Sequence, residues 1–322
     1  MVAEILGTAD QVRPVRRILA WSLGGFAVAA AVGIGVCFWV TEPLEPEDLA
    51  ALDELNHPVV AKVSLATKSK PEASAKVTGP VWPLEKLEGD EAKRLMLELL
   101  LPVEAKLDRM TGYTATFRKQ ERIGTTLRPE ETLAIKIRHR PFAFYGKFLA
   151  PRPGKEVVYA EGHHENKVIA TGGGLTRLLV PRLALDPSSP VALADSRHPV
   201  TDAGLAHLVH RLVRFRKLDL TDAEATTSLD HWTDPSGRRW FRSTHLHSHR
   251  NADRPFAKVE VLYDTASLMP LRISNFDWSA ADALDVVGPL AEKYGYDDVQ
   301  IDVPLSALDF DPANPNYAFH RF

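Results

Sequence analysis

The chain has 322 residues but only one cysteine, and it carries no marked excess of either charge. A single cysteine forms no disulfide within the chain, and Cys37 lies inside an apolar run, so the folded part has no thiol chemistry. A formal net charge of −3 gives no electrostatic footprint for nucleic acid. We therefore expect no nucleic-acid partner.

Common catalytic motifs are also missing. The sequence contains no Gly-x-Ser-x-Gly, no phosphate-binding Gly-Lys-Ser/Thr and no His-Glu-x-x-His. We therefore expect a protein that is not an enzyme and that uses no cofactor.

An uncharged, mostly apolar run covers residues 18–40, directly after Arg13, Arg16 and Arg17. As a helix with about 1.5 Å of rise per residue, it is long enough to cross a hydrocarbon core of roughly 30 Å. The arginines predict that residues 1–17 are cytoplasmic, because positive charge flanks the cytoplasmic end of a span. The run predicts a single-pass anchor in the inner (cytoplasmic) membrane, with the rest of the chain extracytoplasmic or periplasmic.

Other interpretations of this run are less well matched. A cleaved signal peptide has an apolar region of about 7–15 residues, and this run continues through Phe38, Trp39 and Val40. A lipoprotein signal ending at Cys37 would place the bulky Val36 where a small residue is preferred. A soluble buried helix does not account for the difference in charge between the two flanks. A retained anchor is the interpretation that the sequence favours.

Residues 41–89 are rich in proline, glutamate, lysine, alanine and serine and have no sustained apolar period. This composition predicts a flexible linker. The remaining residues, 90–322, are enough for one globular domain with a substantial core.

Two segments of this domain have helical periodicity. Apolar side chains recur on one side over residues 90–110, which predicts a helix that Pro102 kinks or splits. A second helix is predicted over residues 202–215, where Leu205, Leu208 and Leu212 lie on its apolar face.

Elsewhere the apolar period changes to two, and turn residues separate short runs. The predicted strands cover residues 113–118, 131–139, 142–149, 156–161, 167–171, 175–180, 225–233, 239–246, 256–263, 271–277 and 294–303. Short connections favour antiparallel pairing, and a sheet of about 10–11 strands must curl or close. The expected fold class is mainly β (α+β), with the two helices covering one face of an antiparallel sheet.

Several short blocks of the sequence resemble, in order, the DUF1571 family of bacterial extracytoplasmic proteins. The blocks are Thr111–Phe117 with Lys119–Arg122, Arg138–Phe142, Lys147–Pro151, Gly154–Tyr159, Leu185–Pro187, Asp195–Thr201, Leu271–Arg272 and Phe276–Trp278. The resemblance covers about residues 95–322 and implies a relation to the lipoprotein-carrier superfamily that includes LolA and LolB. It implies an unclosed antiparallel β-barrel with a hydrophobic cavity on its concave face, and handling of a lipid or lipoprotein.

A concave sheet face of this size suits an apolar ligand. Aromatic side chains of neighbouring predicted strands and the apolar face of the second helix are the candidates to line the cavity. The predicted ligand-binding residues are Tyr113, Phe117, Phe142, Phe144, Phe148, Tyr159, Leu205, Leu208 and Leu212. The competing interpretation of each is a filled core, since most apolar strand positions are packed.

Histidines raise a separate hypothesis. His245, His247 and His249 alternate, so they share one face of a predicted strand. Two histidines at this spacing can hold one zinc ion with a third ligand, which His231 on the preceding strand would supply. The competing interpretation is a solvated strand end before the polar loop 250–254, and our expectation is no metal site.

Residues 195–198 read Asp-Ser-Arg-His, three of which occur in catalytic triads. A triad is defined by its geometry in space, so adjacency in the sequence is not evidence for one. Capping and loop structure before the second helix are the simpler roles. Polar residues at the mouth of a cavity would also position the head group of a ligand.

The sequence thus supports three hypotheses. The first is a membrane-anchored extracytoplasmic module that reversibly buries a lipid or a lipoprotein acyl chain, without catalysis, as a local receptor, sensor or hand-off protein. The second is an envelope scaffold or protein-interaction domain with a filled interior. The third is a metal-dependent site built on the alternating histidines.

Overall fold

The computed structural model describes residues 80–173, 182–280 and 286–320. The predicted anchor over residues 18–40, the linker up to residue 79 and the strand predicted over residues 175–180 lie outside the described residues. Among the helices of the described part, none is both long enough and apolar enough to cross a membrane.

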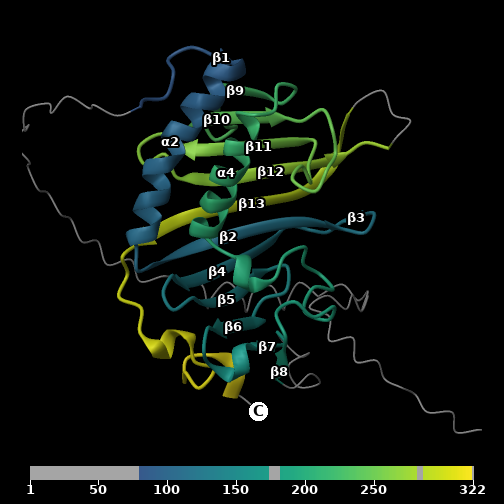
Figure 1. Ribbon diagram of the computed structural model, residues 1–322. Coiled ribbons are helices and arrows are strands. Elements are labelled where there is room, and N and C mark those ends of the chain that lie inside the picture. The colour runs from purple at the N-terminus through teal and green to yellow at the C-terminus, as the bar shows by residue number, and fades with distance from the viewer. Residues whose placement is uncertain (1–79, 174–181, 281–285, 321–322) are drawn as a thin grey trace, which may run out of the picture. The chain divides into compact units, whose positions relative to one another are not determined.

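The described residues form one antiparallel sheet of thirteen strands (Figure 1). Its strands are β1 (Leu87–Glu88), β2 (Gly112–Ile123), β3 (Thr126–Leu127), β4 (Glu131–Arg138), β5 (Ala143–Ala150), β6 (Glu156–Ala160), β7 (Val168–Thr171), β8 (Leu183–Leu185), β9 (Thr226–Thr233), β10 (Arg239–Leu246), β11 (Lys258–Asp264), β12 (Pro270–Trp278) and β13 (Val287–Ile301). Their order in the sheet is β1-β9-β10-β11-β12-β13-β2-β4-β5-β6-β7-β8, with β3 paired to β2 alone. The two ends, β1 and β8, do not pair, so the sheet is open.

The prediction of a mainly β, antiparallel, open sheet is confirmed, but the predicted strand number of 10–11 is wrong for the described residues. The additional strands β1, β3 and β8 have only two or three residues each. A run this short shows no alternation, so periodicity does not detect it.

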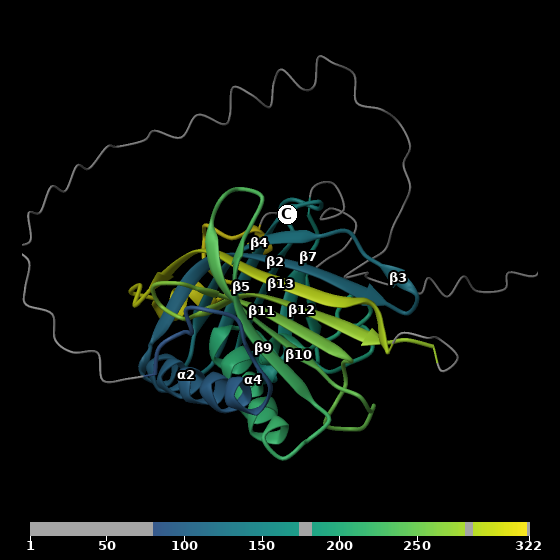
Figure 2. The same ribbon diagram turned by 90° about the horizontal axis from the view of Figure 1, so that it is seen from above.

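Two α-helices, α2 (Gly89–Arg109) and α4 (Leu205–Asp219), lie on the same side of the sheet (Figures 1 and 2). We call the sheet face beneath them the inner face; Tyr113, Phe117 and Leu133 lie on it. Short 3₁₀ helices cover His164–Asn166, Val200–Asp202, Ala307–Phe310 and Ala318–His320.

Helix α2 continues through Pro102, so the predicted split at this residue is wrong, while the alternative of a kink stays a prediction. Proline removes the hydrogen bond to the carbonyl four residues earlier, which here belongs to Glu98. Both residues are exposed, so water can satisfy that carbonyl. The opposite side of the helix buries Met96, Leu100 and Leu107.

The folded part begins before residue 90, which corrects the predicted boundary of the linker. Trp82 is buried, its ring stacks on Phe241 at 4.8 Å between centroids, and its indole N–H donates to the backbone oxygen of Asp230 at 3.2 Å. Strand β1 then pairs with β9. A single aromatic residue among prolines carries no period, which is why composition alone assigned residues 80–89 to the linker.

The C-terminal segment covers the opposite face of β5–β7. Phe310, Tyr317 and Phe319 pack there with Tyr145, and the rings of Tyr145 and Tyr317 stack at 3.9 Å. The outer face of these strands is therefore filled by the C-terminal segment. A site on this part of the sheet can form only on the inner face.

Candidate functional site: an apolar cavity with a polar end

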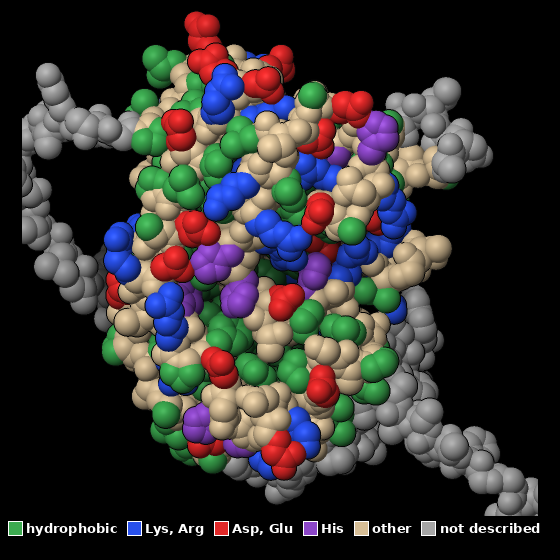
Figure 3. Space-filling view, in the orientation of Figure 1, with side chains coloured by type: hydrophobic (Ala, Val, Ile, Leu, Met, Phe, Trp, Pro, Cys, Tyr) green, Lys and Arg blue, Asp and Glu red, His purple; other side chains and the backbone are tan. Residues whose placement is uncertain are grey.

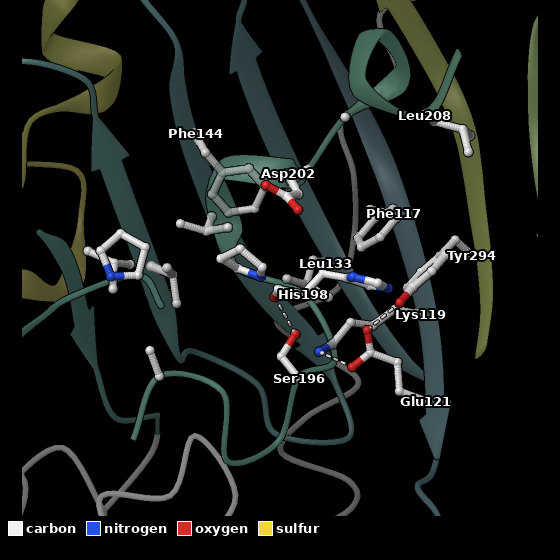
Figure 4. A pocket seen from close by; sticks show the side chains of 18 of the residues that line it. Phe117, Lys119, Glu121, Leu133, Phe144, Ser196, His198, Asp202, Leu208 and Tyr294 are labelled. Atoms are coloured by element: carbon white, nitrogen blue, oxygen red, sulfur yellow. Dashed lines mark hydrogen bonds and ion pairs between the residues drawn. The ribbon is translucent and has the colours of Figure 1, made fainter. Parts of the chain in front are cut away.

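A cavity of about 160 Å³ lies on the inner face. Its floor comes from β2, β4, β5, β6, β7 and β13, and its cover comes from the segment between β8 and α4 and from the first turns of α4 (Figure 4). The apolar side chains that line it are Phe117, Leu133, Phe144, Phe148, Val157, Val168, Pro187, Ala192, Pro199, Val200, Ala203 and Leu208.

Strand register explains why the floor is apolar. Phe117 of β2 lies opposite Leu133 of β4, which lies opposite Phe148 of β5, and on the other side Phe117 lies opposite Tyr296 of β13. Directly opposite residues point to the same face of a sheet. Four strands therefore place large apolar side chains in one row beneath the cavity.

The cover is the segment of residues 186–204, which we call the covering loop. At its end, Gly204 has φ 108°, and a Cβ there would lie 3.1 Å from the Ile137 side chain and 3.2 Å from the Tyr113 hydroxyl. Glycine adopts this φ without strain. The next residue, Leu205, donates its backbone N–H to the Tyr113 hydroxyl oxygen at 2.9 Å. Tyr113 thus fixes the start of α4 against the sheet.

One end of the cavity is polar. Lys119, Glu121 and Tyr294 lie there, next to Ser196 and His198 of the covering loop (Figure 4). The Glu121 carboxylate accepts hydrogen bonds from Lys119 at 3.3 Å, from the backbone N–H of Arg197 at 3.2 Å and from the Tyr294 hydroxyl. Burial raises the pKa of Tyr294, and the nearby Glu292 and Glu121 carboxylates raise it further. Tyr294 therefore stays a neutral hydrogen-bond donor.

Ion pairs fasten the covering loop to the sheet. Glu292 of β13 is fully buried and contacts Nε of Arg197 at 2.9 Å and Nε2 of His198 at 2.8 Å. Asn275 donates to the same carboxylate at 2.7 Å. Burial acts to raise the pKa of Glu292, but the donors from His198, Asn275 and Arg197 outweigh it and hold that pKa below its ordinary value. The loop therefore rests on a buried carboxylate that stays charged.

A second set of ion pairs acts at Asp195. Its carboxylate lies 3.5 Å from Arg128 and 3.7 Å from Arg152. Arg152 also pairs with the Glu131 carboxylate of β4. Opposite charges thus hold both ends of the Asp195–His198 stretch.

The structure separates the predicted ligand-binding residues into three groups. Phe117, Phe144, Phe148 and Leu208 line the cavity. Phe142 lines a different depression of about 120 Å³, with His139 and His207. The rest are packed in the hydrophobic core: Tyr113, Tyr159, Leu205 and Leu212. Periodicity identified the inner face but not the part of it that is left unfilled.

The polar residues of the cavity were not among the predicted site residues, apart from the Asp195–His198 stretch. Lys119 and Glu121 continue the alternation of Phe117 along β2, so a strict count of period two would have placed them on the same face. Arg211 follows Leu208 at helical spacing in the same way. The hydroxyl of Ser196 donates to the backbone oxygen of His198 at 3.0 Å, so Ser196 and the His198 ring do not form a nucleophile–base pair.

The histidines on which the alternative metal hypothesis rests do not converge. His245 lies opposite Thr227 and His231 lies opposite Phe241, so the two histidines are about 13 Å apart along the strands. Both ring nitrogens of fully buried His245 contact hydroxyls, Thr227 at 3.0 Å and Ser243 at 2.9 Å. His247 contacts the backbone oxygen of Phe256 at 2.8 Å. Over the described ranges, no group of three or more His, Cys, Asp or Glu side chains could hold a metal ion.

Solved structures of several bacterial proteins align with this chain at low similarity. A DUF1329 family protein from Desulfovibrio piger shares 11% identity over 68% of this chain and 97% of its own, with a TM-score of 0.34. Lipoprotein LppX of Mycobacterium tuberculosis shares 14% identity over 66% and 98%, with a TM-score of 0.31. A LolA superfamily protein from Nitrosomonas europaea shares 9% identity over 66% and 96%, with a TM-score of 0.19. Likenesses this weak indicate nothing about ligand or activity.

Sequence comparison is more decisive. No curated protein matches the chain significantly. The family described as "Protein of unknown function (DUF1571)" matches residues 110–319, which is more than half of the chain and agrees with the blocks recognised in the sequence. The chain therefore belongs to the DUF1571 family.

Proposed function

We propose that this protein reversibly binds a hydrophobic ligand, a lipid or the acyl chain of a lipoprotein, in the cavity beneath the covering loop. The observation that carries the proposal is an apolar floor and cover with polar side chains gathered at one end. This is the distribution that a chain with a head group requires. Burial of the chain supplies about 25 cal/mol per Å² removed from water, so burying about 200 Å² is worth about 5 kcal/mol before the costs of binding.

The volume of the cavity limits what fits without movement. Its 160 Å³ is close to that of an engineered cavity of about 150 Å³ that binds benzene. A long acyl chain needs more room, so it must extend through the mouth or displace the covering loop. Because that loop covers the cavity and is joined to the sheet by ion pairs, it is the element that we expect to move.

The binding is non-catalytic in this proposal. Ser196, which lies close to His198 at the cavity, donates its hydroxyl hydrogen to a backbone oxygen. Reversible transfer of a chain requires burial of apolar surface and no group transfer.

We further propose that residues 18–40 anchor the domain in the inner membrane, with the cavity outside the cytoplasm. The arginines before an uncharged run of this length support this topology. Carbonate extraction of membranes tests the anchor, and a C-terminal alkaline phosphatase fusion, active only outside the cytoplasm, tests the topology. A fusion that is inactive while the protein is stable would contradict the proposed side of the membrane.

Binding is tested by mass spectrometry of organic extracts of the full chain and by titration with a fluorescent fatty acid. The decisive variant is Ala192→Trp, because Ala192 lines the cavity. Its matched control is Val191→Trp, because Val191 is the adjacent residue and is exposed. We expect Ala192→Trp to weaken binding at least about tenfold and Val191→Trp to leave it unchanged. A clean extract with no binding by the wild type would instead favour the envelope-scaffold function.

A further inference from the structure

Arg211 is a charged residue that lines the cavity. It lies on α4, three residues after Leu208, and both side chains line the cavity. Residues at this spacing share one face of a helix. Its hydrocarbon stem can therefore continue the apolar wall while the guanidinium remains available at the polar end.

This guanidinium has no partner among the described residues. Lys119, the other cation that lines the cavity, has carboxylates of Glu121 at 3.3 Å and Glu131 at 3.4 Å. Three arginines of the neighbouring ion-pair networks also have carboxylate partners: Arg197, Arg128 and Arg152. Arg211 makes neither a hydrogen bond nor an ion pair within residues 80–173, 182–280 and 286–320.

The carboxylates that line the cavity, unlike the Arg211 guanidinium, already have hydrogen-bond donors or water around them. Glu121 already accepts from Lys119, Arg197 and Tyr294. Asp202 also lines the cavity, is exposed to water and accepts a hydrogen bond from the hydroxyl of Thr201 at 3.4 Å. A cationic head group would therefore meet carboxylates that protein donors or water already solvate, whereas an anionic one would meet a guanidinium that has neither a hydrogen bond nor an ion pair within the described residues.

The position of the charge is marked by two neighbouring tyrosines. Burial raises the pKa of both Tyr294 and Tyr296, and the positive charge of Arg211 acts against that shift at each hydroxyl. The guanidinium therefore acts on both tyrosines of β13, of which Tyr294 belongs to the polar end of the cavity. On the face of the molecule where α2 and α4 lie, Lys and Arg side chains also gather near the middle (Figure 3).

We infer that the cavity takes a single-chain amphiphile with an acidic head group, a carboxylate or a phosphate, and that Arg211 binds this group while the chain lies on Phe117, Leu133 and Phe148. A guanidinium presents a planar fork of donors that matches either acid in a bidentate arrangement. This inference rests on the proposed function, since it names the class of ligand for the same cavity.

The test compares ligands that share one octyl chain and differ in head group: octanoate, octyl phosphate, octanol and octyltrimethylammonium. Each is titrated at neutral pH, below its micelle concentration, into the full chain. The variants are Arg211→Gln, which removes the charge, and Arg211→Lys, which keeps the charge but not the fork. The control is Arg214→Gln, because Arg214 is exposed on the same helix and pairs with Asp253.

We expect wild type to bind at least one of the two acids about tenfold more tightly than octanol. The tighter acid identifies the head group. Arg211→Gln should abolish this preference while octanol binding stays within about twofold, and Arg211→Lys should retain part of it. Arg214→Gln should behave as wild type.

Two results would overturn the inference and leave the proposed function intact. One is equal binding of octanol and both acids by wild type, and the other is an undiminished preference in Arg211→Gln. Tightest binding of octyltrimethylammonium would overturn it as well. If none of the four ligands binds, the cavity does not hold hydrophobic chains, and the proposed function fails together with the inference.

Discussion

Nε2 of His198 lies 2.8 Å from Oε2 of Glu292, and this contact joins the covering loop to the centre of the sheet. Glu292 is fully buried, whereas His198 is partly exposed at the surface of the loop. The sheet thus supplies a fixed negative charge, and the loop supplies the groups that can leave it.

Replacing Glu292 by Gln should destabilise the protein at neutral pH by about 2–4 kcal/mol, because Arg197 and His198 lose their buried counter-charge. The pKa of Glu292 is held below its ordinary value, so its contribution is present above the unfolded pKa of about 4.5 and is lost as pH falls through the folded value. The stability difference between wild type and variant should therefore shrink in acid. Urea unfolding at neutral and acidic pH measures it, with exposed Glu98→Gln as the control. A difference that is independent of pH would contradict the assignment.

His245 should make the protein sensitive to acid over a different range. Burial, and then the charge of Arg216, hold the pKa of His245 well below its ordinary value. The unfolded chain binds a proton below about pH 6.5 that the folded chain does not, so stability falls by up to about 1.4 kcal/mol per pH unit below that point. His245→Asn should remove this part of the slope, measured as the free energy of unfolding from neutral pH to about pH 5. Exposed His163→Asn should leave the slope unchanged.

Lys155 should be a site where a substitution stabilises the protein. Its buried amine has no hydrogen-bond acceptor within the described residues and lies 4.4 Å from the centroid of the Phe148 ring. Burial, and then the charge of Arg152, lower its pKa to about 7. The unfolded lysine stays protonated up to about pH 10.5, so wild type loses stability as pH falls from there to about 7.

Lys155→Met should therefore be more stable than wild type near neutral pH, by about 1–3 kcal/mol after the lost contact with Phe148 is subtracted. The gain should shrink as pH rises from about 7 to about 10.5, because the unfolded lysine then gives up its proton more readily and deprotonation on folding costs less. Thermal unfolding across this range measures the gain. Lys147→Met, at an exposed position of the same sheet, is the control, and an equal gain from it would refute the explanation.

Trp82 should be essential to the folded domain although it precedes the first helix. Trp82→Ala removes the stacking on Phe241 and the hydrogen bond to Asp230 and should cost about 3 kcal/mol. Val81→Ala is the matched control, because Val81 is exposed. Chemical denaturation measures both variants, and equal stability of the two would show that residues 80–89 are a linker after all.

Side-chain periodicity predicted which residues share a face of the sheet, but it did not predict which of them line the cavity. The alternation of Phe117, Lys119 and Glu121 places all three on the inner face, but only Phe117 was expected there. The side chains of the neighbouring strand decide whether a row of inward-facing residues is packed in the hydrophobic core or joins a polar cluster. Here β13 brings Tyr294 opposite Lys119 and Glu292 opposite Glu121, and β13 lies far away in the sequence.

The same limit applies to the residues that proved to be core. Tyr113 and Phe117 have the same local pattern and the same strand. Tyr113 is covered by the start of α4, through its hydrogen bond to Leu205, while Phe117 faces the cavity. No pattern within the strand distinguishes them, because the difference lies in where the helix packs.

The sequence by itself determined the family, the long strands, the two helices and their apolar faces, because these depend on neighbours within a few residues. The tertiary structure decided that the covering loop closes over Phe117 and Phe148, that Glu292 anchors this loop, and that Arg211 lines the cavity with no ion pair among the residues that the structure describes. Those relationships join residues that are distant in the chain. They are set by strand register and helix packing, which local periodicity does not encode.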